Sequence, residues 1–135
     1  MATNKADNFI EEMAQWAATQ SDIQALALVG SHARGTARKD SDIDLILITD
    51  EPDDYINDNQ WIQQFGIIKK KQIEHYGLVT SVRVWYDNGL EVEFGITDQR
   101  WAALPIDPGT RSVIANGLKV LFEQENTLSR LLLSK

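Results

Sequence analysis

The chain has 135 residues, with 20 acidic residues against 13 Lys and Arg, so its formal net charge is −7 at pH 7. This length fits a single domain over residues 1–135 with a buried core. The absence of cysteine excludes disulfides and cysteine-ligated zinc, and the acidic balance does not favour binding to nucleic acid. No apolar run reaches the length of a membrane span, and the first residues contain no apolar signal region. We therefore expect a cytoplasmic protein that binds neither membrane nor nucleic acid.

The first half of the chain shows helix and strand patterns in turn. Apolar residues at helical spacing predict an amphipathic helix over 6–19, and the apolar run 25–29 predicts a buried strand that ends at Gly30. Ser31 is a candidate N-cap for one or two helical turns after that strand. Residues 42–49 predict a second strand, and apolar positions between 55 and 65 predict a short helix. Residues 67–77 fit either an irregular strand or a loop.

Residues 81–96 carry the clearest local signal, two alternating runs around the dipeptide Asn-Gly at 88–89. This dipeptide favours a type I′ turn with a two-residue loop. Such a turn sets Tyr86 opposite Glu91 and places Glu91 and Glu93 on one face. The other face, predicted to be core, then carries Trp85, Leu90, Val92 and Phe94.

Beyond this hairpin the patterns continue to mix helix and strand. We expect a capped short helix over 97–104, a helix that ends at Gly117, and a strand over 118–123. A terminal helix follows, with Asn126 or Thr127 as its cap. The whole order predicts an α+β fold of mixed α/β type.

Two motifs within residues 29–48 predict one chemistry. Strand alternation places the carboxylates of Asp42 and Asp44 on one face. Close carboxylates ionise together only around a cation, and a site made of oxygen ligands selects a hard ion such as Mg²⁺. Gly30 and Ser31 stand at a strand-to-helix junction, where free N–H groups attract anions. Basic residues that can neutralise phosphate follow: Arg34, Arg38 and Lys39. Together these features predict a nucleoside triphosphate site for two-metal chemistry.

A third carboxylate would complete such a site. The hairpin offers Glu91 and Glu93, and strand alternation alone does not choose between them. A lone D-x-D motif is more often two solvated side chains, and a lone Gly-Ser is more often a turn. Their joint occurrence at this spacing, beside an apolar strand, favours the functional interpretation.

The segment GSHARGTARKDSDIDL resembles the signature of the DNA polymerase beta-like nucleotidyltransferase superfamily, a glycine-serine followed by D-x-D. It is similar to the small bacterial aminoglycoside-nucleotidyltransferase-like and minimal nucleotidyltransferase branches. The resemblance covers roughly residues 25–96. It implies a nucleotidyltransferase core, with a mixed, mostly antiparallel sheet and helices packed mainly on one face.

The family's third-carboxylate strand has an acidic residue between apolar ones, and on that pattern Glu91 takes the acidic place and Glu93 is held in reserve. The resemblance implies transfer of a nucleoside monophosphate, expected to be AMP from ATP, to an acceptor hydroxyl. Two Mg²⁺ ions are then expected at the catalytic carboxylates Asp42, Asp44 and Glu91. The nucleotide is expected to lie against Gly30, Ser31, Arg34 and Arg38.

The acceptor is expected to be a small molecule such as an aminoglycoside. Family enzymes that modify antibiotics usually carry a further helical domain, so a full acceptor pocket here would need a homodimer. The alternative is a minimal nucleotidyltransferase antitoxin that adenylylates a partner toxin, which a small helical toxin encoded next to it would favour. A degenerate nucleotide-binding module is the third possibility, and retention of Ser31, Asp42, Asp44 and a third acid speaks against it.

Overall fold

A computed structural model of the chain describes residues 5–38 and 41–133. In chain order its elements are α1 (Lys5–Ala18), β1 (Ile23–Val29), α2 (Gly30–Arg34), β2 (Ile43–Thr49), α3 (Pro52–Asn57), α4 (Gln60–Gln63), β3 (Ile68–Tyr76), β4 (Val79–Tyr86), β5 (Glu91–Thr97), the 3-10 helix η1 (Gln99–Ala102), α5 (Pro108–Ala115), β6 (Leu118–Glu123) and α6 (Ser129–Leu133). The predicted helices and strands are confirmed. The helix expected between 55 and 65 is divided into α3 and α4, and the ambiguous stretch 67–77 forms strand β3.

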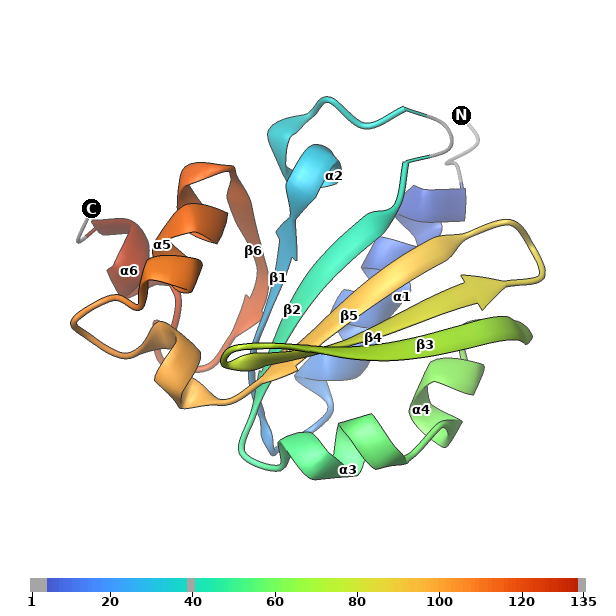
Figure 1. Ribbon diagram of the computed structural model, residues 1–135, viewed down its shortest axis with the longest axis horizontal. Coiled ribbons are helices and arrows are strands. Elements are labelled where there is room, and N and C mark those ends of the chain that lie inside the picture. The colour runs from blue at the N-terminus through green and yellow to red at the C-terminus, as the bar shows by residue number, and fades with distance from the viewer. Residues whose placement is uncertain (1–4, 39–40, 134–135) are drawn as a thin grey trace.

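The strands form one six-stranded sheet in the order β3-β4-β5-β2-β1-β6. Strands β2 and β5 pair in parallel at its centre, and the remaining pairings are antiparallel. The sheet is open, and β3 and β6 lie at its two edges (Figure 1). The mixed, mostly antiparallel α+β core is therefore confirmed.

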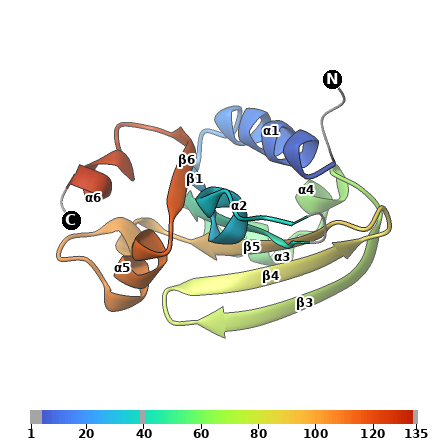
Figure 2. The ribbon, with the colours of Figure 1, turned by 90° about the horizontal axis from the view of Figure 1, so that it is seen from above.

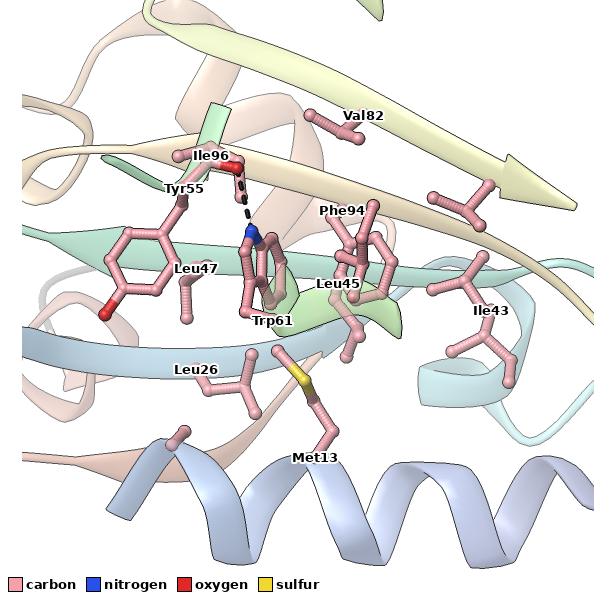
Figure 3. Close-up of a cluster of buried hydrophobic side chains, with 14 of the residues drawn as sticks. Met13, Leu26, Ile43, Leu45, Leu47, Tyr55, Trp61, Val82, Phe94 and Ile96 are labelled. Atoms are coloured by element: carbon pink, nitrogen blue, oxygen red, sulfur yellow. Dashed lines mark hydrogen bonds between the residues drawn. The ribbon is translucent and has the colours of Figure 1, made fainter. Parts of the chain in front are cut away.

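The larger part of the core lies between the sheet and helices α1, α3 and α4. Met13 of α1 packs towards Leu26, Leu45 and Phe94 of the strands, and Trp61 of α4 joins them (Figure 3). The indole N–H of Trp61 is buried and donates to the carbonyl of Tyr55 at 2.8 Å, so this large side chain is buried with its polar atom satisfied.

A smaller apolar cluster covers part of the opposite face, under η1, α5 and α6. It includes Ala27 and Ile46 from the sheet and Trp101 from η1. Figure 2 shows α1 and α5 on opposite sides of the sheet. Most of the helical covering is on the α1 side, as expected, and the second cluster closes only one part of the other face. In the described part of the chain, no helix is long and apolar enough to cross a membrane.

The hairpin between β4 and β5 differs from the predicted one by one residue. Its loop is closed by Tyr86 and Leu90, with the Tyr86 N–H donating to the Leu90 carbonyl at 2.9 Å. Gly89 has a positive φ of 94°, whereas Asn88 does not, so the turn is not the two-residue type I′ form. A three-residue loop with glycine in the left-handed position is the common alternative.

This longer loop changes which β4 residues face the acidic side of the hairpin. Trp85 lies opposite Glu91 and Arg83 lies opposite Glu93. The predictions that Tyr86 opposes Glu91 and that Trp85 is core are therefore wrong, and Tyr86 is buried instead. A one-residue shift moves every side chain to the other face of its strand.

Acidic side chains cap the N-termini of three helices, η1, α5 and α6. Asp98 caps η1 by accepting from the Arg100 N–H, and Asp107 caps α5 through the N–H groups of Gly109 and Thr110. For α6, the Glu123 side chain accepts the N–H groups of Leu128 and Ser129. The expected caps of α6, Asn126 or Thr127, are therefore incorrect.

Candidate active site

Acidic side chains meet at one end of the central strands, on the face away from the α1 core. Asp44 on β2 pairs in register with Val29 of β1 on one side and with Glu93 of β5 on the other. Asp42 directly precedes β2, which begins at Ile43. Because Ile43 and its apolar neighbours point into the core, the acidic residues between them point to the opposite face.

A guanidinium from β4 lies among these acids. Nη1 of Arg83 is 3.0 Å from Oδ2 of Asp42 and also pairs with Oε2 of Glu91, while Nη2 pairs with Oε2 of Glu93. The hydrogen bond to Glu91 and the charge of Glu93 raise the pKa of Arg83 above its ordinary value, against the effect of burial. Sequence analysis missed Arg83, because the predicted hairpin register placed it on the other face.

Asp44 has no ion-pair partner among the described residues. Burial, together with the nearby charges of Glu93 and Asp42, raises its pKa from 3.8 to about 6, although the charge of Arg83 acts in the opposite direction. Crowded carboxylates without a neutralising cation behave in this way. Asp44 is thus the carboxylate whose charge is least compensated.

Gly30 brings the backbone close to Asp44. It is the first residue of α2, has φ of 74°, and a Cβ atom built on it would overlap Oδ2 of Asp44. Only glycine satisfies both conditions without strain. The cap residue of α2 is Val29, so the prediction of Ser31 as N-cap is wrong, and Ser31 lies in the first turn instead.

Two cavities border the acidic cluster and divide the predicted residues between them. The lining of the larger cavity, of 1070 Å³, includes Gly30, Arg34, Asp42, Asp44, Arg83 and Glu93. The smaller, of 520 Å³, is lined by Arg38 and Glu91 together with Lys5 and His32. Ser31 lines neither cavity, and Lys39 lies outside the described residues. Sequence reasoning had placed the seven predicted site residues together in one site: Gly30, Ser31, Arg34, Arg38, Asp42, Asp44 and Glu91.

The donor set suits a hard divalent ion, since it consists of carboxylate oxygens beside a glycine that leaves space for a ligand. In the described ranges, however, no three His, Asp or Glu side chains are arranged to hold a metal ion as they stand. Instead, the positive charge among the acids is the Arg83 guanidinium, which partly neutralises the clustered carboxylates.

Comparisons with known proteins agree with this geometry. The sequence matches the family model described as "Nucleotidyltransferase domain" over residues 7–97, which spans β1, β2, β5 and the acidic cluster. A search of curated protein sequences finds no significant match.

Two solved structures share the fold. One is an aminoglycoside 6-adenyltransferase from Bacillus subtilis, with a TM-score of 0.59 and 14% identity, matched over 87% of this chain and 40% of that one. The other is the polymerase core of TRAMP, an RNA surveillance complex, with a TM-score of 0.50 and 13% identity, matched over 67% of this chain and 30% of that one. The chain thus spans less than half of either protein. With the family match covering more than half of the sequence, this chain belongs to the nucleotidyltransferase domain family.

Proposed function

We propose that this chain transfers AMP from ATP to a hydroxyl group of a small cationic acceptor, and that Asp42, Asp44 and Glu93 hold two Mg²⁺ ions for the reaction. Nucleotidyl transfer in general follows from the family. The choice of nucleotide, metal and acceptor is the proposal. One observation carries it: the three carboxylates and Gly30 line the same cavity of 1070 Å³.

Glu93, and not the Glu91 expected from the sequence pattern, is our choice for the third carboxylate. Glu93 is the in-register neighbour of Asp44 and lines the same cavity. Glu91 lines the smaller cavity, with Arg38 and His32. Adjacent positions on parallel strands bring two carboxylates to one ion, which supports Glu93 as the shared ligand.

Each residue then has a defined task in the transfer. A divalent ion bound by the carboxylates would supply Lewis-acid stabilisation of the triphosphate charge. Gly30 lets the phosphates approach the backbone, and Arg34, which lines the same cavity, neutralises phosphate charge. The acceptor oxygen forms a bond to the α-phosphorus while the bond to pyrophosphate breaks. Glu93 accepts the proton of the acceptor hydroxyl.

The cavity also supports a small acceptor. Pockets for a single small ligand are commonly about 300–1,000 Å³, and this cavity, at 1070 Å³, is at the large end of that range. Its lining includes Asp107 of the α5 cap in addition to the acidic cluster. Carboxylates on several sides favour a cationic molecule, and aminoglycosides have both amino groups and hydroxyls.

The test is transfer by the purified chain. It is incubated with ATP, Mg²⁺ and a panel of aminoglycosides, and pyrophosphate release is measured together with the mass of each acceptor. We expect an AMP adduct on at least one acceptor, and none with Asp44→Asn. Adducts on protein but on no small molecule would overturn the proposed acceptor, and no pyrophosphate release with any acceptor would overturn the proposed activity.

A further inference from the structure

Arg83 is held by three carboxylates from two separate segments of the chain. It contacts Asp42 before β2 and both Glu91 and Glu93 on β5. The four side chains are between 27% and 38% exposed, so these charges are partly withdrawn from water. Three of the four ion pairs found in the described ranges involve this one guanidinium. The acidic cluster therefore contains its own counter-ion, the Arg83 guanidinium.

The contacts of Arg83 and those of a metal ion on the same oxygens exclude each other. Nη1 stands 3.0 Å from Oδ2 of Asp42, whereas Mg²⁺ needs oxygens at about 2.0–2.1 Å in octahedral order. A planar guanidinium therefore holds the carboxylate oxygens farther apart than a metal would. This explains why no three acids of the described residues are arranged as metal ligands.

We propose that Arg83 is a resident counter-ion that competes with divalent metal for Asp42 and Glu93, and that it leaves these carboxylates when the metal enters. The inference rests on the metal site of the proposed function. The metal-free cluster is then stabilised by Arg83, and metal alone binds weakly because it must first displace a cation. The metal–nucleotide complex brings further contacts that compensate for this displacement.

Arg83 has room to move. It lines the larger cavity, so its long side chain can turn from the carboxylates into open space without any change in β4. The Trp85 ring lies on the same face of β4, with its centroid 6.0 Å from Cζ of Arg83. The guanidinium is thus already within cation–π range of this ring, which also has Nζ of Lys70 at 4.8 Å from its centroid, and it can keep this contact when it leaves the carboxylates.

Metal affinity without nucleotide gives the test. Binding of Mn²⁺ is measured by the loss of the free-ion EPR signal and by titration calorimetry. Removing a competing cation from half-buried carboxylates should tighten binding, so we expect Arg83→Gln to bind Mn²⁺ about tenfold or more tightly than the parent. A purely structural role predicts the opposite, because loss of the side chain would loosen the ligands.

A second pair of variants removes the risk that three unpaired acids prevent folding. Glu91→Gln is compared with the double variant Arg83→Gln/Glu91→Gln, which has one acid fewer and spares the proposed ligands. The double variant should again bind Mn²⁺ more tightly than its single-variant reference. Arg100→Gln is the charge control: it breaks the exposed ion pair with Asp98 and should leave Mn²⁺ affinity unchanged.

The possible outcomes distinguish a failure of this inference from a failure of the proposed function on which it rests. Equal or weaker Mn²⁺ binding in both Arg83 variants, with the parent still binding more tightly than Asp44→Asn, overturns the competition and keeps the metal site. Equal Mn²⁺ binding by the parent and Asp44→Asn overturns the metal site itself, and the role of Arg83 with it. Tighter binding in both Arg83 variants, with Arg100→Gln unchanged, supports the proposal.

Discussion

The two faces of the paired strands β2 and β5 are built from alternate residues of the same short segments, yet one face is apolar and the other is acidic. One face presents Ile43, Leu45 and Phe94 to the α1 core, where each is 2% exposed or less (Figure 3). The other presents Asp42, Asp44 and the hairpin glutamates around a single guanidinium. The apolar face stabilises the fold, whereas the acidic face brings like charges together at a cost. Such a local conflict is typical of a functional site.

The largest expected effect is on the apolar face. Phe94→Ala removes a fully buried ring that packs against Phe9 and Trp61. We expect the free energy of unfolding to fall by about 3–5 kcal/mol. Urea denaturation, analysed by linear extrapolation, measures it. A loss below about 1 kcal/mol would mean that the ring is not packed as the structure has it.

One residue away, on the acidic face, a substitution should reduce activity strongly and stability little. Glu93→Gln should lower the transfer rate about a hundredfold or more, because it removes a metal ligand and proton acceptor. Its melting temperature in chelator should stay close to that of the parent. Glu91→Gln is the matched control, since Glu91 also pairs with Arg83, through Nη1, and this variant should lose less than about tenfold. A larger loss of rate in Glu91→Gln than in Glu93→Gln would identify Glu91 as the third carboxylate.

Gly30 joins the two motifs, and Gly35 provides its control. Both have positive φ, 74° and 75°, so alanine is strained by about 1–2 kcal/mol at either position. Only at Gly30 would the new Cβ overlap Asp44, whereas at Gly35 it meets no atom within 4 Å. We expect Gly30→Ala to lose about 1–3 kcal/mol more stability than Gly35→Ala, and to bind ATP less tightly. Equal losses would show that Asp44 does not lie over Gly30.

The smallest effect is a pH dependence in chelator. With a folded-state pKa of about 6 against 3.8, Asp44 keeps its proton longer in the folded state than in the unfolded one. Stability contributed by this residue is therefore present below pH 3.8 and is lost as the pH rises to about 6. Asp44→Asn should melt above the parent at pH 7, and this advantage should vanish in acid. A variant that melts well below the parent at pH 7 would show that the carboxylate supports the fold.

Most of the fold could be predicted from sequence because it depends on local pattern. The alternation in residues 42–49 and the apolar helix face before it specify strand and helix, and the structure contains both. Strand β3 could not be predicted because it is an edge strand with two exposed lysines, Lys69 and Lys70, and because its pairing with β4 depends on the tertiary structure. The periodicity of apolar residues in the sequence carries no information about which strands pair.

The candidate site was predicted less completely. Asp42, Asp44 and Gly30 were identified from their motifs, and the structure brings them together. Arg83 was missed because the loop contains one more residue than predicted, Asp87, and this changes the hairpin register. Which glutamate joins Asp44 depends on the parallel pairing of β2 with β5, and strand alternation carries no information about that pairing.

The most direct test of the central claim, that the acidic face holds nucleotide through metal, is ATP binding by calorimetry with Mg²⁺ and with chelator. Without metal, the triphosphate would face Asp42, Asp44 and Glu93 with only partial shielding, so we expect affinity to fall about a hundredfold or more in chelator. In Asp44→Asn, the gain from Mg²⁺ should disappear. ATP affinity that is equal with Mg²⁺ and with chelator would contradict the account.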